Sequence, residues 1–204
     1  MTKKNIFNFV LVSCLLISLA SCGQTSLPYI VDPTIGKTVD KNIELTMSQT
    51  LNAIKSVETI NDSINLENFG IGKNLDAITD AYLSNDTIYI ISAIAARDAT
   101  FGYKIILTRQ NYIINYFSVA DENIFKIKKN DKPGHQISFE CSINKLTLSQ
   151  KLKFEIGEPI EGVLELTTND YWSVSNDIDT KLNKQLTGYF KTKLKSANER
   201  HMNY

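Results

Sequence analysis

From Thr87 onward the chain alternates between apolar and polar side chains with the period of two that is typical of β-strands. Segments rich in β-branched and aromatic residues at 88–95, 103–108 and 112–119 are separated by polar stretches, and the strongest turn sequence is at 130–134. Residues 88–95 are apolar on both faces, as in a strand that is covered on both sides. The pattern predicts a mainly β domain, either an antiparallel β-sandwich or a barrel-like sheet.

The alternation changes phase between residues 143 and 146. Ile137, Phe139, Cys141 and Ile143 are odd-numbered, whereas the apolar residues that follow are even-numbered: Leu146, Leu148, Leu152, Phe154 and Ile156. Because side chains cannot change parity within an unbroken strand, we expect a turn or a bulge near Asn144–Lys145.

The last two predicted strands, 160–168 and 187–194, carry opposite charges on one face. Glu161 and Glu165 lie on the first strand, and Lys191 and Lys193 lie on the second. Antiparallel pairing would match these charges across the ladder, so the two strands are predicted to be neighbours.

One or two short helices are predicted in the N-terminal third. Thr46 and Gln49 match a capping box at the start of a helix that would run to about Val57. A second helix would begin at Asn74 and bury one side that contains Leu75, Ile78 and Tyr82.

The first residues have the features of an export signal. Lys3 and Lys4 precede an apolar stretch at 10–20, which is shorter than the roughly 20 residues that a transmembrane helix needs. A basic start followed by a short apolar segment is typical of a cleaved secretory signal.

The end of this signal, Leu19-Ala20-Ser21-Cys22, resembles the lipobox of bacterial lipoproteins. The resemblance covers the first 22 residues only and implies that the Cys22 thiol receives a diacylglyceryl group and that the chain is cut just before it. We then expect residues 1–21 to be the signal, 22–37 the lipidated cysteine and a tether, 38–195 a single mainly β domain and 196–204 a polar tail. The location would be the membrane surface of the bacterial envelope. In a cell with two membranes it would be the outer one, since residues 23 and 24 include no aspartate.

Charge and cysteine content narrow the classes of function. The chain has 22 basic and 22 acidic residues, which argues against a nucleic-acid binder. Once the signal is removed and Cys22 is lipidated, Cys141 is the last free thiol, so no disulfide within the chain is expected. The position of Cys141 on an apolar row predicts a small buried side chain rather than a reactive one.

The sequence contains few residues of the kind that catalysis requires. The two histidines, His135 and His201, lie in no metal-binding or nucleophile motif, and no cofactor is expected. Among the carboxylates of 155–165, Glu161 and Glu165 share a strand face but would be about 13 Å apart at 3.3 Å per residue. That spacing is too wide for a glycosidase pair without a further partner.

The segment 167–184 is the most distinctive part of the chain. Tyr171 and Trp172, the only tryptophan, are candidates for an aromatic platform that binds a sugar or a partner protein. Asn176, Asp177 and Asp179 are weaker candidates for calcium ligands, because the spacing lacks the pattern of an EF-hand loop. A purely structural interpretation, in which Trp172 covers the core and the polar residues make turns, is favoured over both.

Two hypotheses about function follow. The first is a non-enzymatic binding or structural β-domain, attached to the membrane through its lipid and facing an envelope protein or a glycan. The alternative is a carboxylate-dependent, glycosidase-like hydrolase of the envelope, which would need two acidic side chains to converge.

Overall fold

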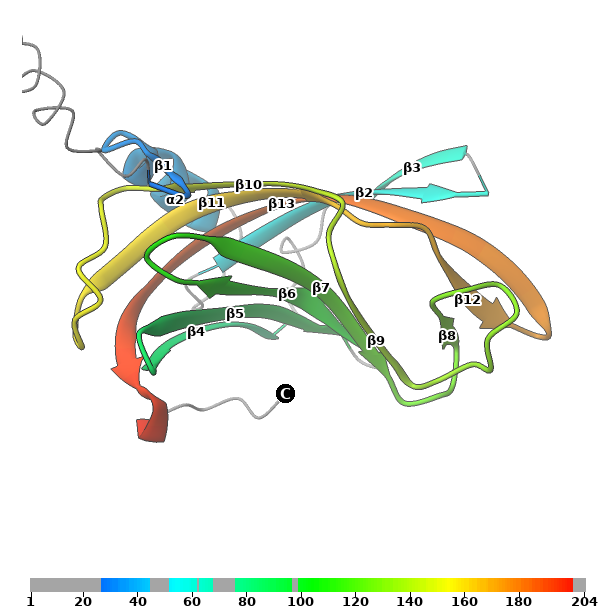
Figure 1. The fold of residues 1–204 in the computed structure, drawn as a ribbon. Coiled ribbons are helices and arrows are strands. Elements are labelled where there is room, and N and C mark those ends of the chain that lie inside the picture. The colour runs from blue at the N-terminus through cyan, green and yellow to red at the C-terminus, as the bar shows by residue number, and fades with distance from the viewer. Residues whose placement is uncertain (1–26, 45–51, 62, 68–75, 97–98, 200–204) are drawn as a thin grey trace, which may run out of the picture.

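The computed structural model describes residues 27–44, 52–61, 63–67, 76–96 and 99–199. Within these residues the protein is mainly β, with a single α-helix, and the expected fold class is confirmed. The sheet folds into two layers that resemble a sandwich (Figure 1). It does not close into a barrel.

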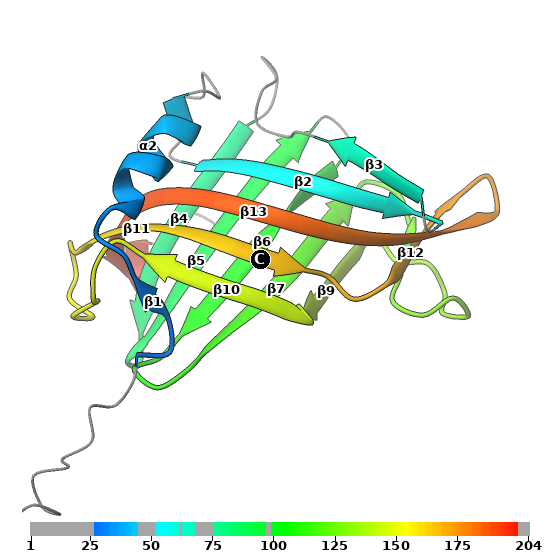
Figure 2. The same ribbon diagram turned by 90° about the horizontal axis from the view of Figure 1, so that it is seen from above.

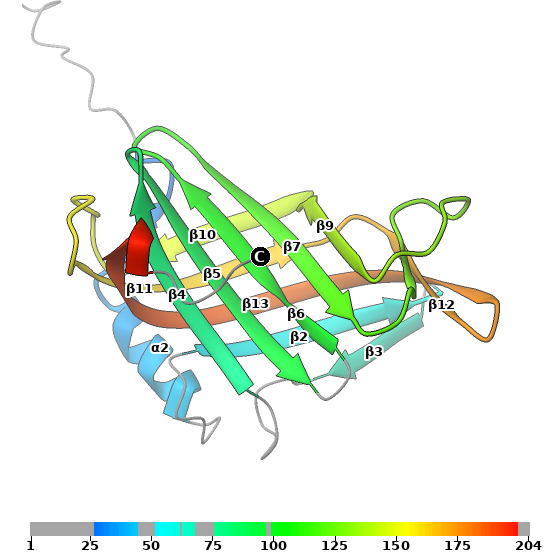
Figure 3. The same cartoon turned by 90° about the horizontal axis from the view of Figure 1, so that it is seen from below.

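The two layers differ in strand direction, and strands of one cross those of the other in Figure 2. The upper layer contains β1 (Ile30–Val31), β10 (Ile143–Leu148), β11 (Pro159–Thr167), β13 (Ile178–Ser196), β2 (Asn52–Ile60) and β3 (Ser63–Glu67). The lower layer, seen from outside in Figure 3, contains β4 (Asp76–Ser84), β5 (Thr87–Ala96), β6 (Ala99–Leu107), β7 (Tyr112–Ala120) and β9 (Gln136–Glu140). The short strands β8 (Phe125–Lys126) and β12 (Tyr171–Ser175) extend one end of the upper layer, and η1 (Ala197–Glu199) follows β13.

Strand β13 joins the two layers. Its middle part pairs antiparallel with β11 on one side and with β2 on the other. Its last residues, 194–196, pair in parallel with residues 81–83 of β4 in the lower layer. The sheet is therefore mixed rather than wholly antiparallel.

The hydrophobic core lies between the layers, and the strand alternation decides which side chains enter it. The fully buried members include, from the lower layer, Ile88, Ile90, Tyr103, Ile105 and Ile114, and from the upper layer Ile54, Leu146, Ile160, Leu164 and Phe190. The central strand β5 is covered on both faces, as predicted, because Ile91 and Ala93 belong to a second apolar cluster on its other side.

The change of phase after residue 141 marks the place where the chain leaves one layer for the other. The Cys141 N–H donates to the carbonyl of Ile114 in the lower layer, and the Ser142 N–H donates to the carbonyl of Thr167 in the upper layer. The predicted break is present, but it lies at residues 141–142 rather than at 144–145.

The predicted pairing of the last two strands is confirmed. Glu161 lies opposite Lys191 in the β11–β13 ladder, and their charged atoms are 2.7 Å apart. Glu165 lies opposite Thr187 and instead reaches Lys145 of β10, at 3.5 Å.

The prediction of two helices at 46–57 and from residue 74 onward is wrong for the residues that the structure describes, because these residues lie in strands. Residues 52–57 lie in β2 and residues 76–82 lie in β4; residues 45–51, 74 and 75 are outside the described ranges. Residues i and i+4 share a face in a strand as well as in a helix. The spacing of Ile78 and Tyr82 therefore could not distinguish a helix from a strand.

The helix forms earlier, at α2 (Ile35–Glu44), in and just after the segment expected to be a tether. Pro33, interpreted as a tether residue, precedes the first helical turn, where proline is well tolerated. Helix α2 packs on β11 and β13 in the upper layer (Figure 2), and its Val39 is fully buried. Residues 27–37 are thus part of the folded domain.

Candidate functional site

The hairpin between β12 and β13 accounts for two of the polar residues in the segment 167–184. Ser175 and Ile178 are paired, which leaves Asn176 and Asp177 as a two-residue turn with φ of 49° and 64°. Positive φ at both positions defines a type I′ turn, and Asn and Asp are among the residues that tolerate it best. The turn therefore explains why these residue types occur here.

Tyr171 and Trp172, expected to form one platform, point to opposite faces of β12. Tyr171 is 1% exposed, and its ring centroid lies 6.0 Å from that of Tyr116 and 5.8 Å from that of Phe139. Tyr171 is thus a core residue. Trp172 is half-buried and, as the next residue along the strand, faces outward.

Two lysines flank Trp172 in the ladder, Lys126 of β8 and Lys181 of β13. Residues opposite each other in a ladder have side chains on the same face. Lys126, Trp172 and Lys181 thus form a row, which we call the Trp172 strip. Each lysine is held by a carboxylate: Lys126 Nζ is 2.6 Å from Asp179 Oδ1, and Lys181 Nζ is 3.0 Å from Asp170 Oδ2.

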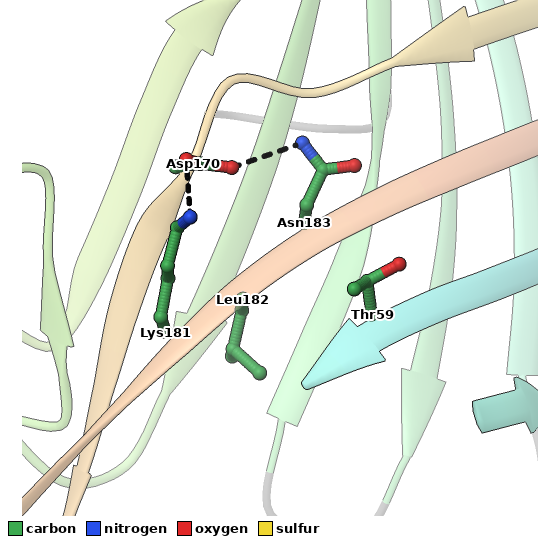
Figure 4. A pocket seen from close by; sticks show the side chains of 5 residues that line it. All are labelled: Thr59, Asp170, Lys181, Leu182 and Asn183. Carbon is green, nitrogen blue, oxygen red and sulfur yellow. Dashed lines mark hydrogen bonds and ion pairs between the residues drawn. The ribbon is translucent and has the colours of Figure 1, made fainter. Parts of the chain in front are cut away.

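A small polar hollow adjoins the strip (Figure 4). Its volume is about 160 Å³, and it is lined by Thr59, Asp170, Lys181, Leu182 and Asn183. The Asn183 amide donates to Asp170 Oδ1 at 3.4 Å, so the carboxylate is held from two sides. Sites for whole small molecules usually measure about 300–1,000 Å³. The hollow is suited to one polar group of a larger partner.

The calcium hypothesis finds no support in this geometry. The Asp179 carboxylate is engaged by Lys126, and Asn176 and Asp177 form the hairpin turn. No group of three or more His, Cys, Asp or Glu side chains in the described part of the chain could hold a metal ion.

The carboxylates of residues 155–165 serve separate structural roles. Glu158 is buried and accepts hydrogen bonds from the N–H groups of Lys153 and Phe154, at 2.8 and 3.0 Å. Glu165 faces Lys145, and Glu155 is exposed.

Glu161 shares its lysine partner with Asp40, a neighbour that the sequence did not reveal. Lys191 Nζ lies 2.7 Å from Glu161 and 3.1 Å from Asp40 of helix α2, so one ammonium group joins two carboxylates. Hydrogen bonds to these carboxylates raise the pKa of Lys191, and the bond to Glu161 has a larger effect than the bond to Asp40. The ion pairs with Lys191 thus give both carboxylates a structural partner.

Two further buried carboxylates are also engaged by lysines. Glu58 lies 3.0 Å from Lys184, and Asp80 lies 2.7 Å from Lys195. Their burial is thus compensated by ion pairs.

Cys141 is buried, as predicted, and burial raises the pKa of its thiol to about 11. A thiol with such a pKa is a poor nucleophile near neutral pH. His135 is exposed on the connection to β9, and Cys22 and His201 lie outside the described residues.

Sequence reasoning found Trp172 but not the groups around it. The turn at Asn176–Asp177 could have revealed Lys181, because a two-residue loop sets the register of the hairpin. Lys126 comes from a distant segment, and no local pattern connects it to Trp172.

The chain was compared with models of protein families, with curated proteins and with solved structures, and none of these matches it. No helix in the described ranges has the length and apolar character to cross a bilayer.

Proposed function

We propose that this chain is a bacterial lipoprotein anchored at the cell envelope through Cys22, and that its β-domain binds an envelope partner without catalysing a reaction. The anchor is supported by the resemblance of Leu19–Cys22 to a lipobox. Two acyl chains or more would hold such a protein on a bilayer stably.

The observation that carries the binding role is the Trp172 strip. An outward indole offers a large contact area at a low entropy cost. The flanking lysines are positioned by Asp179 and Asp170, and the hollow beside them can take one polar group. This combination fits a protein or glycan surface with apolar and polar groups side by side.

The hydrolase alternative has no comparable support. The carboxylates considered for it either pair with lysines, accept backbone hydrogen bonds or stand alone on the surface. Binding therefore remains the better proposal.

The anchor is tested by labelling expressing cells with radioactive palmitate. The parent chain should incorporate label, and the Cys22→Ala variant should not. Equal incorporation by both would contradict the anchor.

The binding role is tested by affinity capture from detergent-solubilised envelope with the parent chain, Trp172→Ala and Tyr189→Ala. Tyr189 is a half-buried aromatic residue on the face of β13 that also carries Lys181. It lies away from the hairpin and serves as the matched control. Trp172→Ala should lose a component that both other proteins retain. If all three capture the same components, the strip does not bind a partner.

A further inference from the structure

The chain enters the described domain beside the loop that connects β10 to β11, residues 149–158. The Tyr29 hydroxyl accepts a hydrogen bond from the Leu152 N–H at 2.9 Å, and β1 pairs in parallel with the end of β10. Residues 23–26 separate Cys22 from Leu27, where the described chain begins. Even fully extended, the five steps from Cys22 to Leu27 span at most about 18 Å. A lipid on Cys22 would therefore hold this loop close to the bilayer.

The loop presents cations and one apolar side chain to the outside. Lys151 and Lys153 are exposed because Leu152 and Phe154, which alternate with them, are buried. Ile156, at the tip of the loop, is 54% exposed.

The neighbouring β6–β7 turn adds another cation. The Arg109 guanidinium lies over the Phe154 ring, 4.6 Å from its centroid, and Arg109 is exposed. We call Arg109, Lys151, Lys153 and Ile156 the anchor-side patch.

The three cations of this patch outnumber the carboxylates of the loop, which are Glu155 and the buried Glu158. No ion pair is formed there by Arg109, Lys151 or Lys153 with a described carboxylate. The Glu158 carboxylate is buried against backbone N–H groups, which leaves Glu155 as the exposed acidic side chain of the loop. A hollow of about 400 Å³ lies beside the lysines, Ile156 and Pro159, and Glu155 and Glu158 also line it. It is wide enough for a phosphate headgroup.

We propose that the anchor-side patch rests on the membrane, with its cations against anionic phospholipid headgroups and Ile156 at the edge of the acyl region. The inference rests on the proposed lipid anchor and deepens it, since it gives the domain one orientation on the bilayer. Basic residues near an anionic membrane and apolar side chains at the interface both favour such contact. The Trp172 strip lies at the opposite end of the domain (Figure 1) and would face away from the lipid.

Hydrogen exchange of the lipidated protein on vesicles tests this orientation. The amides of Leu152, Lys153, Phe154 and Gly157 are hydrogen-bonded and so exchange slowly enough to follow. With phosphatidylglycerol in the vesicles, peptides covering 151–157 should exchange about tenfold more slowly than on pure phosphatidylcholine.

Charge reversal provides matched variants. Lys151→Glu with Lys153→Glu should abolish the difference between the two vesicles. Lys128→Glu with Lys129→Glu, which reverses as many exposed charges in the β8–β9 connection, should leave it intact. Loss of the effect in both variants, or protection of 128–134 instead, overturns the orientation.

Palmitate labelling of the same preparation separates the two proposals. A labelled protein without protection of 151–157 overturns the orientation and leaves the lipoprotein proposal standing. An unlabelled protein overturns both.

Discussion

The two ends of the domain use lysine in opposite ways. At the hairpin end, Lys126 and Lys181 each face an aspartate, and an outward tryptophan lies between them. At the loop end, Lys151 and Lys153 have no described carboxylate partner and lie near an exposed isoleucine. A paired lysine is held in position with its charge largely neutralised, whereas an unpaired one keeps its charge for an external anion. Pairing, rather than the number of lysines, distinguishes a surface suited to a shaped partner from one suited to a bilayer.

The largest expected difference in stability is between variants of the two aromatic residues at the hairpin end, Tyr171 and Trp172. Tyr171→Ala should lower the free energy of unfolding by about 3–5 kcal/mol, because it empties a buried site among other rings. Trp172→Ala should lower it by less than about 1 kcal/mol, because the indole faces outward. Urea unfolding measures both. Similar losses would mean that Trp172 is a core residue and would break the contrast between the ends.

The loop end contains a buried hydrogen bond from the Leu152 N–H to the Tyr29 hydroxyl. Tyr29→Phe should lower the free energy of unfolding by about 1–3 kcal/mol, because the Leu152 N–H loses its buried acceptor. Exchange of the Leu152 amide should accelerate at the same time. Tyr112→Phe is the control, since the Tyr112 hydroxyl has no hydrogen bond with the described residues. If the Leu152 amide is unaffected, the N-terminal segment does not hold the loop.

The buried thiol of Cys141, where the chain crosses between the layers, should make the stability of the fold depend on pH. Burial raises the pKa of the folded thiol to about 11, whereas an unfolded thiol ionises near 8.5. Above about pH 8.5 the unfolded state therefore binds fewer protons, and stability falls as pH rises. We expect a loss of about 1 kcal/mol by pH 10. Unfolding titrations from pH 8 to 10 should show a steeper fall in stability for the parent than for Cys141→Ala; equal slopes would contradict it.

The smallest expected changes in stability test whether the lysines at the two ends differ in their ion pairs. Lys126→Ala should cost up to about 1 kcal/mol of unfolding free energy, because its ion pair with Asp179 is partly buried. Lys151→Ala should cost nothing measurable, because it removes no ion pair. The Lys126→Ala loss should shrink at high salt. Equal costs at both positions would remove the distinction between the ends.

Most of the strands were predictable because their signal is local. Residues 88–95, 103–108 and 112–119 were each assigned from alternation and turn sequences, and β5, β6 and β7 lie there. The Glu161–Lys191 pairing was also predictable, since opposite charges lay on matching faces. Helix α2 was missed because Pro33 and Gly36 resemble linker residues, although a proline is also common where a helix begins.

The candidate site was predictable only in part. Trp172 and the turn residues stood out as types, but the burial of Tyr171 depends on Tyr116 and Phe139, which come from other strands. The lysines of the Trp172 strip likewise depend on which strands become neighbours of β12.

The sequence by itself determined which side chains alternate and that the alternation changes phase near residue 143, because these follow from covalent spacing along one strand. Only the tertiary structure decided that the change of phase carries the chain from one layer to the other. It also decided that Tyr171 is buried while Trp172 faces outward, and which lysines form ion pairs with aspartates. These outcomes depend on contacts between segments far apart in the sequence. Their geometry is set by how the two layers pack together, and no local pattern encodes it.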